Sequence, residues 1–209
     1  TGDEFLDSNH IMATAKHFIG DGGTFKGIDK GDTRISEGGL KNIHGTPYYS
    51  AFEACVQSVM ASFNSWNGVK MHGHEYLLTD VLRDQMGFNG LVVGDWNGHG
   101  EVPGCTNANC PESFNAGVDI YMAPDEWKEL YTNTVRAVKA GDISEDRLDD
   151  AVRKILTVKD RLGMLDGRKP HEYENYVGRT EHRKLAREAV SKSLVLLKNN
   201  DNLLPLDST

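Results

Sequence analysis

The stretch Gly90-Leu91-Val92-Val93-Gly94-Asp95-Trp96 decides the fold of this chain. A short apolar run with adjacent valines, bounded by glycines, is typical of a strand buried on both faces in a parallel sheet. Asp95 follows the run directly, so we expect it at the carboxyl end of the strand. Because α/β barrels carry their chemistry at that end, the stretch predicts an α/β fold with a functional carboxylate.

The pair Asp95-Trp96 suits chemistry on a sugar. A carboxylate can attack or stabilise a cationic carbon, and the flat indole can pack on the C–H face of a sugar ring. Taken alone, Asp95 is better explained as a carboxylate that caps a helix after a strand. The remainder of the sequence has to decide between these two interpretations.

The charge balance excludes one class of partner. The 209 residues include 23 Lys and Arg against 31 Asp and Glu, which gives a formal net charge of −8. A nucleic-acid partner requires a basic surface, so we expect none, and a neutral substrate fits better. No apolar stretch is long enough to span a membrane, so no membrane partner is expected. The sequence opens at Thr1 rather than Met, which indicates a mature, trimmed or excised product.

Strand and helix patterns alternate along residues 1–165. Alternation at this spacing indicates parallel strands joined by crossover helices. A complete eight-fold barrel needs about 250 residues, so we expect roughly half of a (β/α)8 barrel. The predicted strands are 12–18, 59–63, 91–93 and 117–122. The first predicted helix begins at Pro47, and the others cover about 73–86, a short segment near Glu112, 125–140 and 145–162. Ser144 is expected to cap the last of these helices.

The composition changes after Gly163. Residues 166–180 are charged and contain Gly and Pro, which is typical of a linker. Residues 181–193 have a helical pattern. The segment 193–206 combines an apolar strand, a polar turn and a second apolar stretch, so residues 181–209 are predicted to begin another domain.

Two of the three cysteines lie close together in a loop-like segment. Cys105 and Cys110 favour a small disulfide over a metal site, because no second Cys or His pair at zinc spacing accompanies them. A disulfide indicates an oxidising compartment, either periplasmic or extracellular. Cys55 is expected to be a buried free thiol on an apolar helical face. The other candidate metal ligands are His72, His74 and His99. They lack the His-Glu-x-x-His spacing, so we expect no metal site there either. No cofactor is predicted.

Four segments, taken in their order along the chain, resemble glycoside hydrolase family 3. Their particular residues are similar to those of its β-glucosidase and exo-β-glucanase branch. They are Ala15-Lys-His-Phe-Ile-Gly-Asp-Gly-Gly-Thr24, Val59-Met-Ala-Ser-Phe-Asn-Ser-Trp-Asn-Gly68, Gly90-Leu-Val-Val-Gly-Asp-Trp96 and Ser193-Leu-Val-Leu-Leu-Lys-Asn199. The resemblance covers essentially the whole chain. It implies the second half of a TIM-type barrel followed by an α/β sandwich domain, and retaining, exo-acting hydrolysis that releases glucose from β-glucans or aryl β-glucosides.

The resemblance also implies roles for particular residues. Asp95 matches the catalytic nucleophile, which must be ionised to attack, so a cation is expected nearby. Lys16 and His17 match a pair that binds sugar hydroxyls. If they lie in a strand, a strand end or bulge must let both side chains reach one site. Met60 and Trp96 match residues that line the pocket.

Three further positions are informative. Phe63 stands where relatives carry Tyr, so one hydroxyl donor is absent. Asp21 lies in a Gly-rich turn that superficially resembles a phosphate cradle. However, no Lys-Ser/Thr follows it, and the turn more readily lets the backbone approach the pocket. The loop Ile28-Asp-Lys-Gly-Asp32 lacks the Asp-x-His acid/base of the N-acetylglucosaminidase branch. The acid/base is therefore expected outside this segment, and Glu75 and Glu101 are expected to be solvent-facing or structural.

Several alternatives remain open. Lys16 at a strand end permits a barrel aldolase that works through a Schiff base. A chain without its acid/base could be a non-catalytic sugar-binding fragment. β-Xylosidase and β-N-acetylhexosaminidase activities occur in the same family. In each glycosidase interpretation, the rest of the polypeptide is needed to complete the barrel and supply the acid/base.

Overall fold

The computed structural model describes residue 6, residues 11–167 and residues 176–207. The chain divides into two compact units, Thr1–Lys169 and Pro170–Thr209. Within the described ranges, every helix is too short or too polar to cross a membrane.

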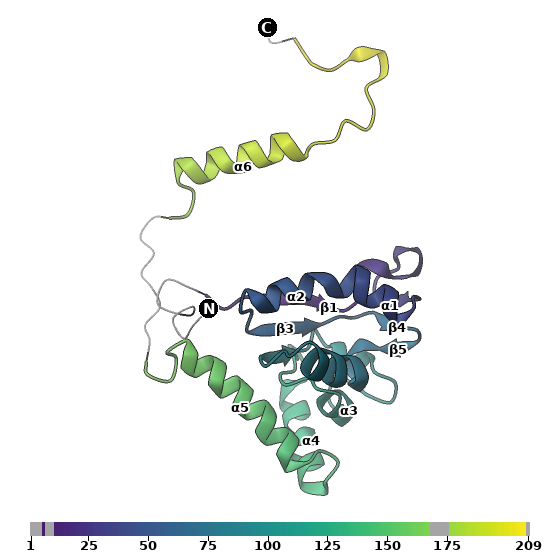
Figure 1. Ribbon diagram of the computed structural model, residues 1–209, viewed down its shortest axis with the longest axis vertical. Helices are drawn as coiled ribbons and strands as arrows, with labels where there is room; N and C mark the ends of the chain where they lie inside the picture. The colour runs from purple at the N-terminus through teal and green to yellow at the C-terminus, as the bar shows by residue number, and fades with distance from the viewer. Residues whose placement is uncertain (1–5, 7–10, 168–175, 208–209) are drawn as a thin grey trace. The chain divides into compact units, whose positions relative to one another are not determined.

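A parallel sheet organises the first unit (Figure 1). Its strands are β1 (Thr14–Phe18), β3 (Ser58–Ala61) and β6 (Leu91–Val93), in the order β1-β3-β6. The strand predicted from the Leu91–Val93 run is confirmed with its bounds. The predicted α/β class is also confirmed, whereas the expectation that the chain forms half of a (β/α)8 barrel stays a prediction.

The strand predicted at 117–122 is wrong in extent, because it is reduced to one parallel bridge between Ile120 and Val93. A side chain explains the loss. The Val92 N–H, which would pair with a backbone carbonyl in a longer ladder, donates instead to the Asp119 carboxylate at 2.8 Å. Gly117, with a φ of 121°, also departs from strand geometry just before this point.

Strand β1 contains an irregularity at Lys16-His17. Ala15 faces Val59 and Phe18 faces Ala61, so three steps along β1 match two steps along β3. The extra residue falls within Lys16-His17 and breaks the regular alternation of side chains. The sequence analysis expected a strand end or bulge at this pair, and the bulge is present, whereas a shared site for both side chains stays a prediction.

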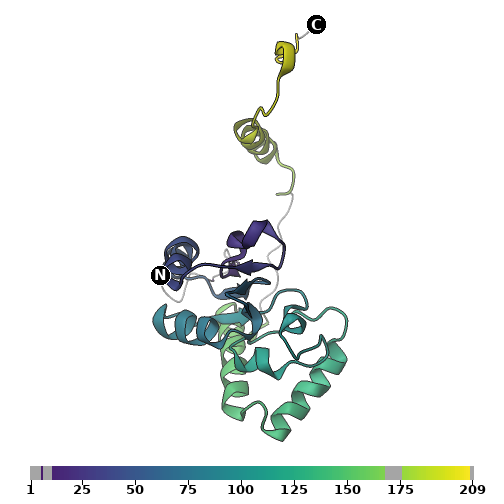
Figure 2. The same ribbon diagram turned by 90° about the vertical axis from the view of Figure 1, so that its right-hand side faces the viewer.

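The helices after β1 and β3 lie on the same side of the sheet (Figure 2). After β1, α1 (Glu37–Gly39), the π-helix η3 (Leu40–Gly45) and α2 (Thr46–Glu53) run without a break. The helical segment therefore begins well before Pro47, because the Ser36 hydroxyl caps it by accepting from Gly39 N–H at 3.2 Å. After β3, the π-helix η5 (Tyr76–Gln85) buries Leu77, Leu78 and Leu82.

Short elements cover the carboxyl end of the sheet. The segment after β1 contains β2 (Asp32–Thr33), which pairs in parallel with β4 (Ser65–Trp66). Strand β4 in turn pairs antiparallel with β5 (Val69–Lys70). The remaining short turns are η1 (Asp21–Gly23), η2 (Phe25–Gly27), η4 (Met71–Gly73) and η6 (Gly98–Glu101). The main core lies between the sheet and its helices and includes Phe18, Leu40, Tyr48, Val59, Met71, Leu77, Leu78, Leu82, Phe88, Val92 and Val118.

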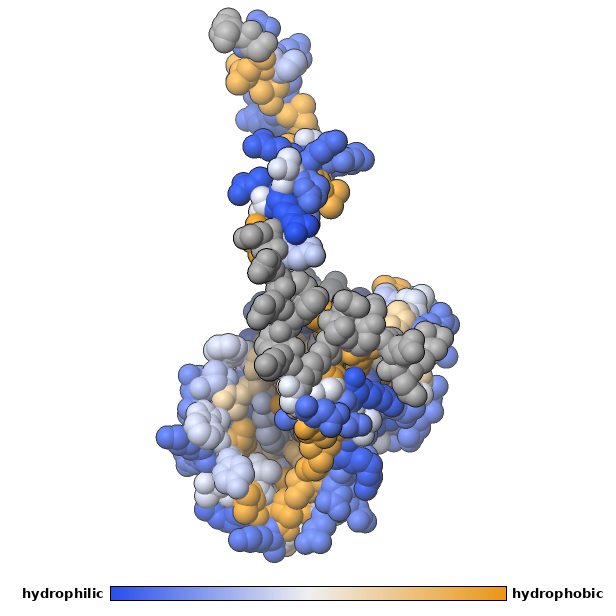
Figure 3. Space-filling model, turned by 90° about the vertical axis from the view of Figure 1, so that its left-hand side faces the viewer, coloured by the Kyte–Doolittle hydropathy of each residue, from blue (hydrophilic) through white to orange (hydrophobic). Residues whose placement is uncertain are grey.

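Three α-helices complete the first unit: α3 (Pro111–Asn115), α4 (Trp127–Ala140) and α5 (Glu145–Arg161). Ser144 caps α5 as predicted, accepting from Arg147 N–H at 3.1 Å. The apolar side chains of α5 are only partly buried. Ala151 is buried, but Val152 and Leu156 are exposed and, with Leu165, form an apolar band on the surface (Figure 3).

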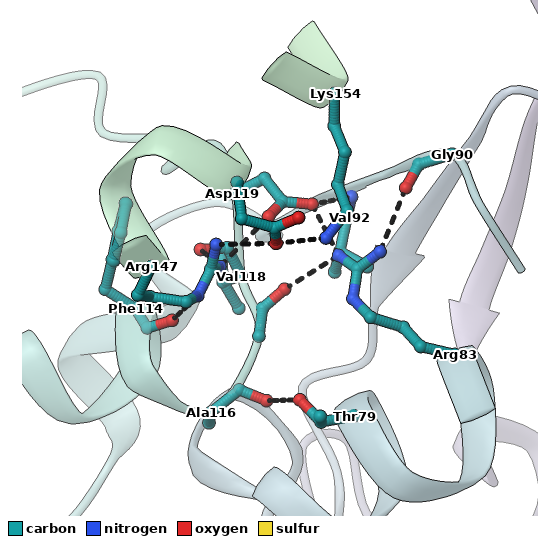
Figure 4. A network of polar contacts seen from close by, with 12 residues as sticks. Thr79, Arg83, Gly90, Val92, Phe114, Ala116, Val118, Asp119, Arg147 and Lys154 are labelled. Atoms are coloured by element: carbon teal, nitrogen blue, oxygen red, sulfur yellow. Dashed lines mark hydrogen bonds and ion pairs between the residues drawn. The ribbon is translucent and has the colours of Figure 1, made fainter. Parts of the chain in front are cut away.

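A buried ion-pair network holds the segment between α3 and Ile120 in place (Figure 4). The fully buried Asp119 carboxylate accepts from Arg83 at 2.6 Å and from Arg147 at 2.9 Å. The same two arginines donate to main-chain carbonyls of the segment, Arg83 to Gly117 and Arg147 to Val118. The network thus joins η5, β6 and α5 through one carboxylate.

The second unit contains α6 (Thr180–Ser193), which confirms the helix predicted at 181–193, and the short turn η7 (Asn200–Asn202). The apolar strand predicted from residue 193 is not formed, because Leu194–Asn199 has no strand partner for its backbone groups among the described residues of this unit. Most of the predicted linker 166–180 lies outside the described residues.

The cysteine predictions are partly confirmed. Cys105 and Cys110 form a disulfide, as expected. Cys55 is free, but it follows α2 in a left-handed conformation and is half-buried, so the expectation of a buried helical thiol is wrong.

Candidate active site

Asp95 follows β6 after one residue, Gly94, at the carboxyl end of the sheet. Its side chain is only 14% exposed. One carboxylate oxygen, Oδ1, accepts from the Trp96 backbone N–H at 2.7 Å. The other, Oδ2, lies 3.3 Å from Nε2 of His17. Asp95 thus follows the predicted Leu91–Val93 strand and lies next to an imidazole, a group that can carry positive charge, whereas its role as nucleophile stays a prediction.

His17 joins two carboxylates. Its Nδ1 lies 3.2 Å from Asp21 Oδ2, while its Nε2 faces Asp95. Ionised carboxylates only accept hydrogen bonds, so the imidazole satisfies both contacts when both ring nitrogens carry hydrogen. Asp21 was expected only to shape a turn, and its contact with His17 is a role that sequence reasoning missed. The spacing of four residues between them was the available signal.

His72 holds the backbone of Asp95. Its Nε2 accepts from the Asp95 N–H at 2.8 Å. The ring is 1% exposed, and burial lowers the pKa of His72 to about 4, against the opposing effect of the nearby Asp95 charge. His72 is therefore neutral at physiological pH. Sequence reasoning weighed His72 as a metal ligand, did not expect a metal there, and missed the contact with Asp95.

The other predicted site residues are placed differently. Lys16 is exposed on the wall of a groove that His17, Asp21 and His44 also line. Met60 lies in β3, half-buried and in register with Val93. Trp96 is 59% exposed beside Asp95. The structure thus brings His17 into contact with Asp95, whereas roles for Lys16, Met60 and Trp96 remain predictions.

Phe63 lies in a cluster of charged groups. The Lys30 ammonium lies 4.5 Å from the centre of the Phe63 ring, within cation–π range. Lys30 also donates to Glu101 at 2.8 Å, and Lys70 lies 3.6 Å from the same carboxylate. The hydrogen bond from Lys30 holds the pKa of Glu101 below its usual value. Glu101 therefore stays ionised and acts as a structural ion-pair partner, and Glu75 is exposed at the start of η5.

The histidines considered above as metal ligands have separate partners. Nδ1 of His74 accepts from Leu77 N–H at 3.4 Å, and Nε2 of His99 lies 2.8 Å from the Asn107 carbonyl. Among the described residues, the one close group of metal-type ligands is Cys105, Cys110 and Glu112, and its two sulfurs are bonded to each other.

The family follows from residues 4–158, which match the model of the glycosyl hydrolase family 3 N terminal domain. This match covers more than half of the chain, so the chain belongs to glycosyl hydrolase family 3.

Three individual proteins are similar to this chain in sequence or in structure. A β-xylosidase from Formosa agariphila is 38% identical over 99% of this chain. The exo-1,3/1,4-β-glucanase ExoP from a Pseudoalteromonas species superposes with a TM-score of 0.89 at 52% identity over 98% of this chain. The β-glucosidase of Listeria innocua, in complexes with glucose and with laminaribiose, superposes with a TM-score of 0.82 at 29% and 28% identity over 98% of this chain.

The chain is much shorter than these proteins. It spans 30% of the β-xylosidase, 26% of ExoP and 29% of the Listeria enzyme.

Proposed function

We propose that this chain carries the nucleophile of a retaining, exo-acting β-glucoside and β-glucan hydrolase that releases glucose from non-reducing ends. The observation that carries the proposal is the carboxylate of Asp95 at the end of β6, with its two oxygens facing the Trp96 N–H and His17. Family membership supports hydrolysis of glycosides, and the glucose and laminaribiose complexes of the Listeria enzyme support β-glucosides as the substrate class.

In the proposed first step, Asp95 Oδ2 bonds to the anomeric carbon as the bond to the leaving oxygen breaks. The electron pair goes to that oxygen, which takes a proton from the acid/base. In the second step, the same acid/base removes a proton from water, which attacks the anomeric carbon and frees Asp95. Retention follows from the two successive displacements.

The neighbouring residues supply binding. His17 stands where it can donate to the nucleophile or to a sugar hydroxyl, and Lys16 extends the same groove with an ammonium that offers three donors. Trp96 presents an exposed ring next to Asp95, suited to packing on the C–H face of a sugar. Met60, half-buried in the adjacent strand β3, is proposed to line the sugar-binding pocket.

The acid/base is proposed to lie outside this chain. A general acid has to hold a proton at working pH, but Glu101 is kept ionised by Lys30 and Lys70. The side chain of Glu75 is exposed to solvent. This chain covers only 30% of the Formosa β-xylosidase and 26% of ExoP, so sequence outside it can supply the carboxyl group.

The domain organisation is proposed on the same basis. Residues 1–165 form the second half of a (β/α)8 barrel, 166–180 a linker and 181–209 the start of an α/β sandwich. The parallel sheet and the exposed apolar band on α5 support a barrel completed by further polypeptide. The Cys105–Cys110 disulfide supports a periplasmic or extracellular location.

Xylosidase activity is the second candidate, because the Formosa relative is named a β-xylosidase. The test uses the full-length protein with aryl β-glucoside and aryl β-xyloside, each with and without Asp95→Asn. We expect faster glucoside hydrolysis and its loss, by at least about 10³-fold, in the variant. Undiminished turnover by Asp95→Asn refutes the proposal, and faster xyloside hydrolysis transfers it to xylosides. Sugar binding without any hydrolysis in the wild type identifies a non-catalytic binding protein.

A further inference from the structure

Three of the backbone N–H groups that follow β6 donate to main-chain carbonyls. Gly94 N–H donates to the Ile120 carbonyl, Asn97 N–H to the Met122 carbonyl and Gly98 N–H to the Asp95 carbonyl. The Asp95 N–H departs from this pattern, because its acceptor is the side chain of His72, in η4. The residue with the candidate nucleophile is thus fixed by a buried imidazole.

The His72 ring is held in the one protonation form that can do this. An imidazole nitrogen accepts a hydrogen bond only when it carries no hydrogen, so Nε2 must be bare and the neutral ring carries its hydrogen on Nδ1. The backbone of Ser62 opposes the effect of burial and raises the pKa of this ring. The tautomer of the neutral ring is therefore determined by its contact with the Asp95 N–H.

The main chain makes room for this ring. A Cβ at Gly98 would lie 2.2 Å from His72 Nε2, which is well inside van der Waals contact. A Cβ at Gly94 would lie 3.4 Å from the same ring. Glycine at position 98, just after Asp95-Trp96, is thus required for the imidazole to reach the Asp95 N–H.

We propose that His72 is a positioning residue for Asp95, whose Nε2 fixes the backbone of the nucleophile and thereby directs its carboxylate toward the sugar. This inference rests on the proposed function. A misplacement of about 1 Å at a reacting group can cost about 10²-fold in rate. A residue that acts in this way changes the rate of bond formation at Asp95 while leaving sugar affinity nearly unchanged.

The test measures nucleophilic attack in the full-length protein. A 2-deoxy-2-fluoro-β-glucoside with an activated leaving group traps the glycosyl-enzyme, and gives separate values for affinity and for the rate constant of inactivation. His72→Phe keeps a buried ring without the acceptor. We expect its inactivation rate constant to fall about 100-fold, with affinity within about threefold of wild type.

Two variants separate positioning from packing. His72→Gln restores an acceptor near the Nε2 position, and we expect it to recover at least about tenfold of the lost rate. His99→Phe is the matched control, because His99 is also buried with a lowered pKa but contacts Asn107 and not Asp95. We expect its rate constant to stay within about threefold of wild type.

Gly98→Ala tests the same contact without changing the imidazole. We expect it to lower the inactivation rate constant in the same way, because its Cβ displaces the ring. This variant and His72→Gln carry the test if His72→Phe does not fold.

The outcomes distinguish the two proposals. If the label is on Asp95 but His72→Phe or Gly98→Ala reacts at the wild-type rate, the positioning role is overturned and the proposed function stands. Equal loss in His99→Phe also overturns the positioning role, because packing alone would then explain the effect. If the wild type is labelled elsewhere or not at all, the proposed function fails.

Discussion

His17 and Asp95 face each other across the sheet, with Nε2 of His17 3.3 Å from Asp95 Oδ2, although their strands are separated by β3. The extra residue in β1 at Lys16-His17 accounts for the orientation, because it interrupts side-chain alternation at this pair. The relationship gives the candidate nucleophile a hydrogen-bonding partner that can also carry positive charge.

Loss of this partner should reduce catalysis. We expect His17→Ala to lower kcat/KM for an aryl β-glucoside about 10²-fold, because an orienting donor next to the nucleophile is removed. Asp21→Asn should have a smaller effect, on the order of tenfold, since its amide oxygen can still accept from Nδ1. Steady-state kinetics on the folded full-length variants provide the measurement. A His17→Ala enzyme with wild-type kcat/KM would show that the contact has no catalytic role.

Asp119 should be essential for stability. Asp119→Ala leaves Arg83 and Arg147 buried without their shared carboxylate, and such a loss costs about 3–5 kcal/mol of unfolding free energy. The exposed pair of Arg34 and Asp32 provides the control, where Arg34→Ala should cost about 1 kcal/mol or less. Urea unfolding of the variants gives both values. Equal losses in the two variants would contradict a central role for the network.

Stability should fall with acid because His72 is buried and neutral. Its folded pKa of about 4 lies below the usual 6.5, so the unfolded state binds more protons between these two pH values. Unfolding free energy should therefore decrease as pH falls from 6.5 to 4, by on the order of 3 kcal/mol from this group. His72→Gln should flatten that part of the profile relative to His99→Gln. Parallel pH profiles for wild type and His72→Gln would exclude His72 as the cause.

The disulfide loop should contribute a modest stability. Cys105 and Cys110 are five residues apart, and loop-closure entropy for such a short ring gives about 2 kcal/mol. The double variant Cys105→Ser/Cys110→Ser should lose this amount in urea unfolding. Cys55→Ser, which removes the free thiol, should stay within about 1 kcal/mol of wild type. A double variant as stable as wild type would show that the bridge is energetically silent.

Local patterns predicted the elements that depend on adjacent residues. The Leu91–Val93 strand, the Ser144 cap and the Cys105–Cys110 bridge follow from runs and spacings within a few positions. Features set by distant partners were missed. His72 reaches Asp95 through tertiary packing, and Asp119 takes the Val92 N–H that a longer strand would have paired.

The helical segment after β1 shows the same limit. Pro47 is a strong local signal for a helix start, but Ser36 caps the segment earlier, through α1 and a π-helical turn that no periodicity indicated. The apolar run after Ser193 has strand composition, without a neighbouring strand to pair with in the described part of its unit. Composition alone therefore could not decide its conformation.

The most direct test of the central claim is peptide mass spectrometry of the full-length protein after reaction with an activated 2-deoxy-2-fluoro-β-glucoside. The account predicts one fluoroglucosyl group, attached to Asp95 in the peptide that contains Gly94-Asp95-Trp96. A label on any other carboxylate, or rapid hydrolysis of β-glucosides that leaves Asp95 unlabelled under trapping conditions, would contradict it.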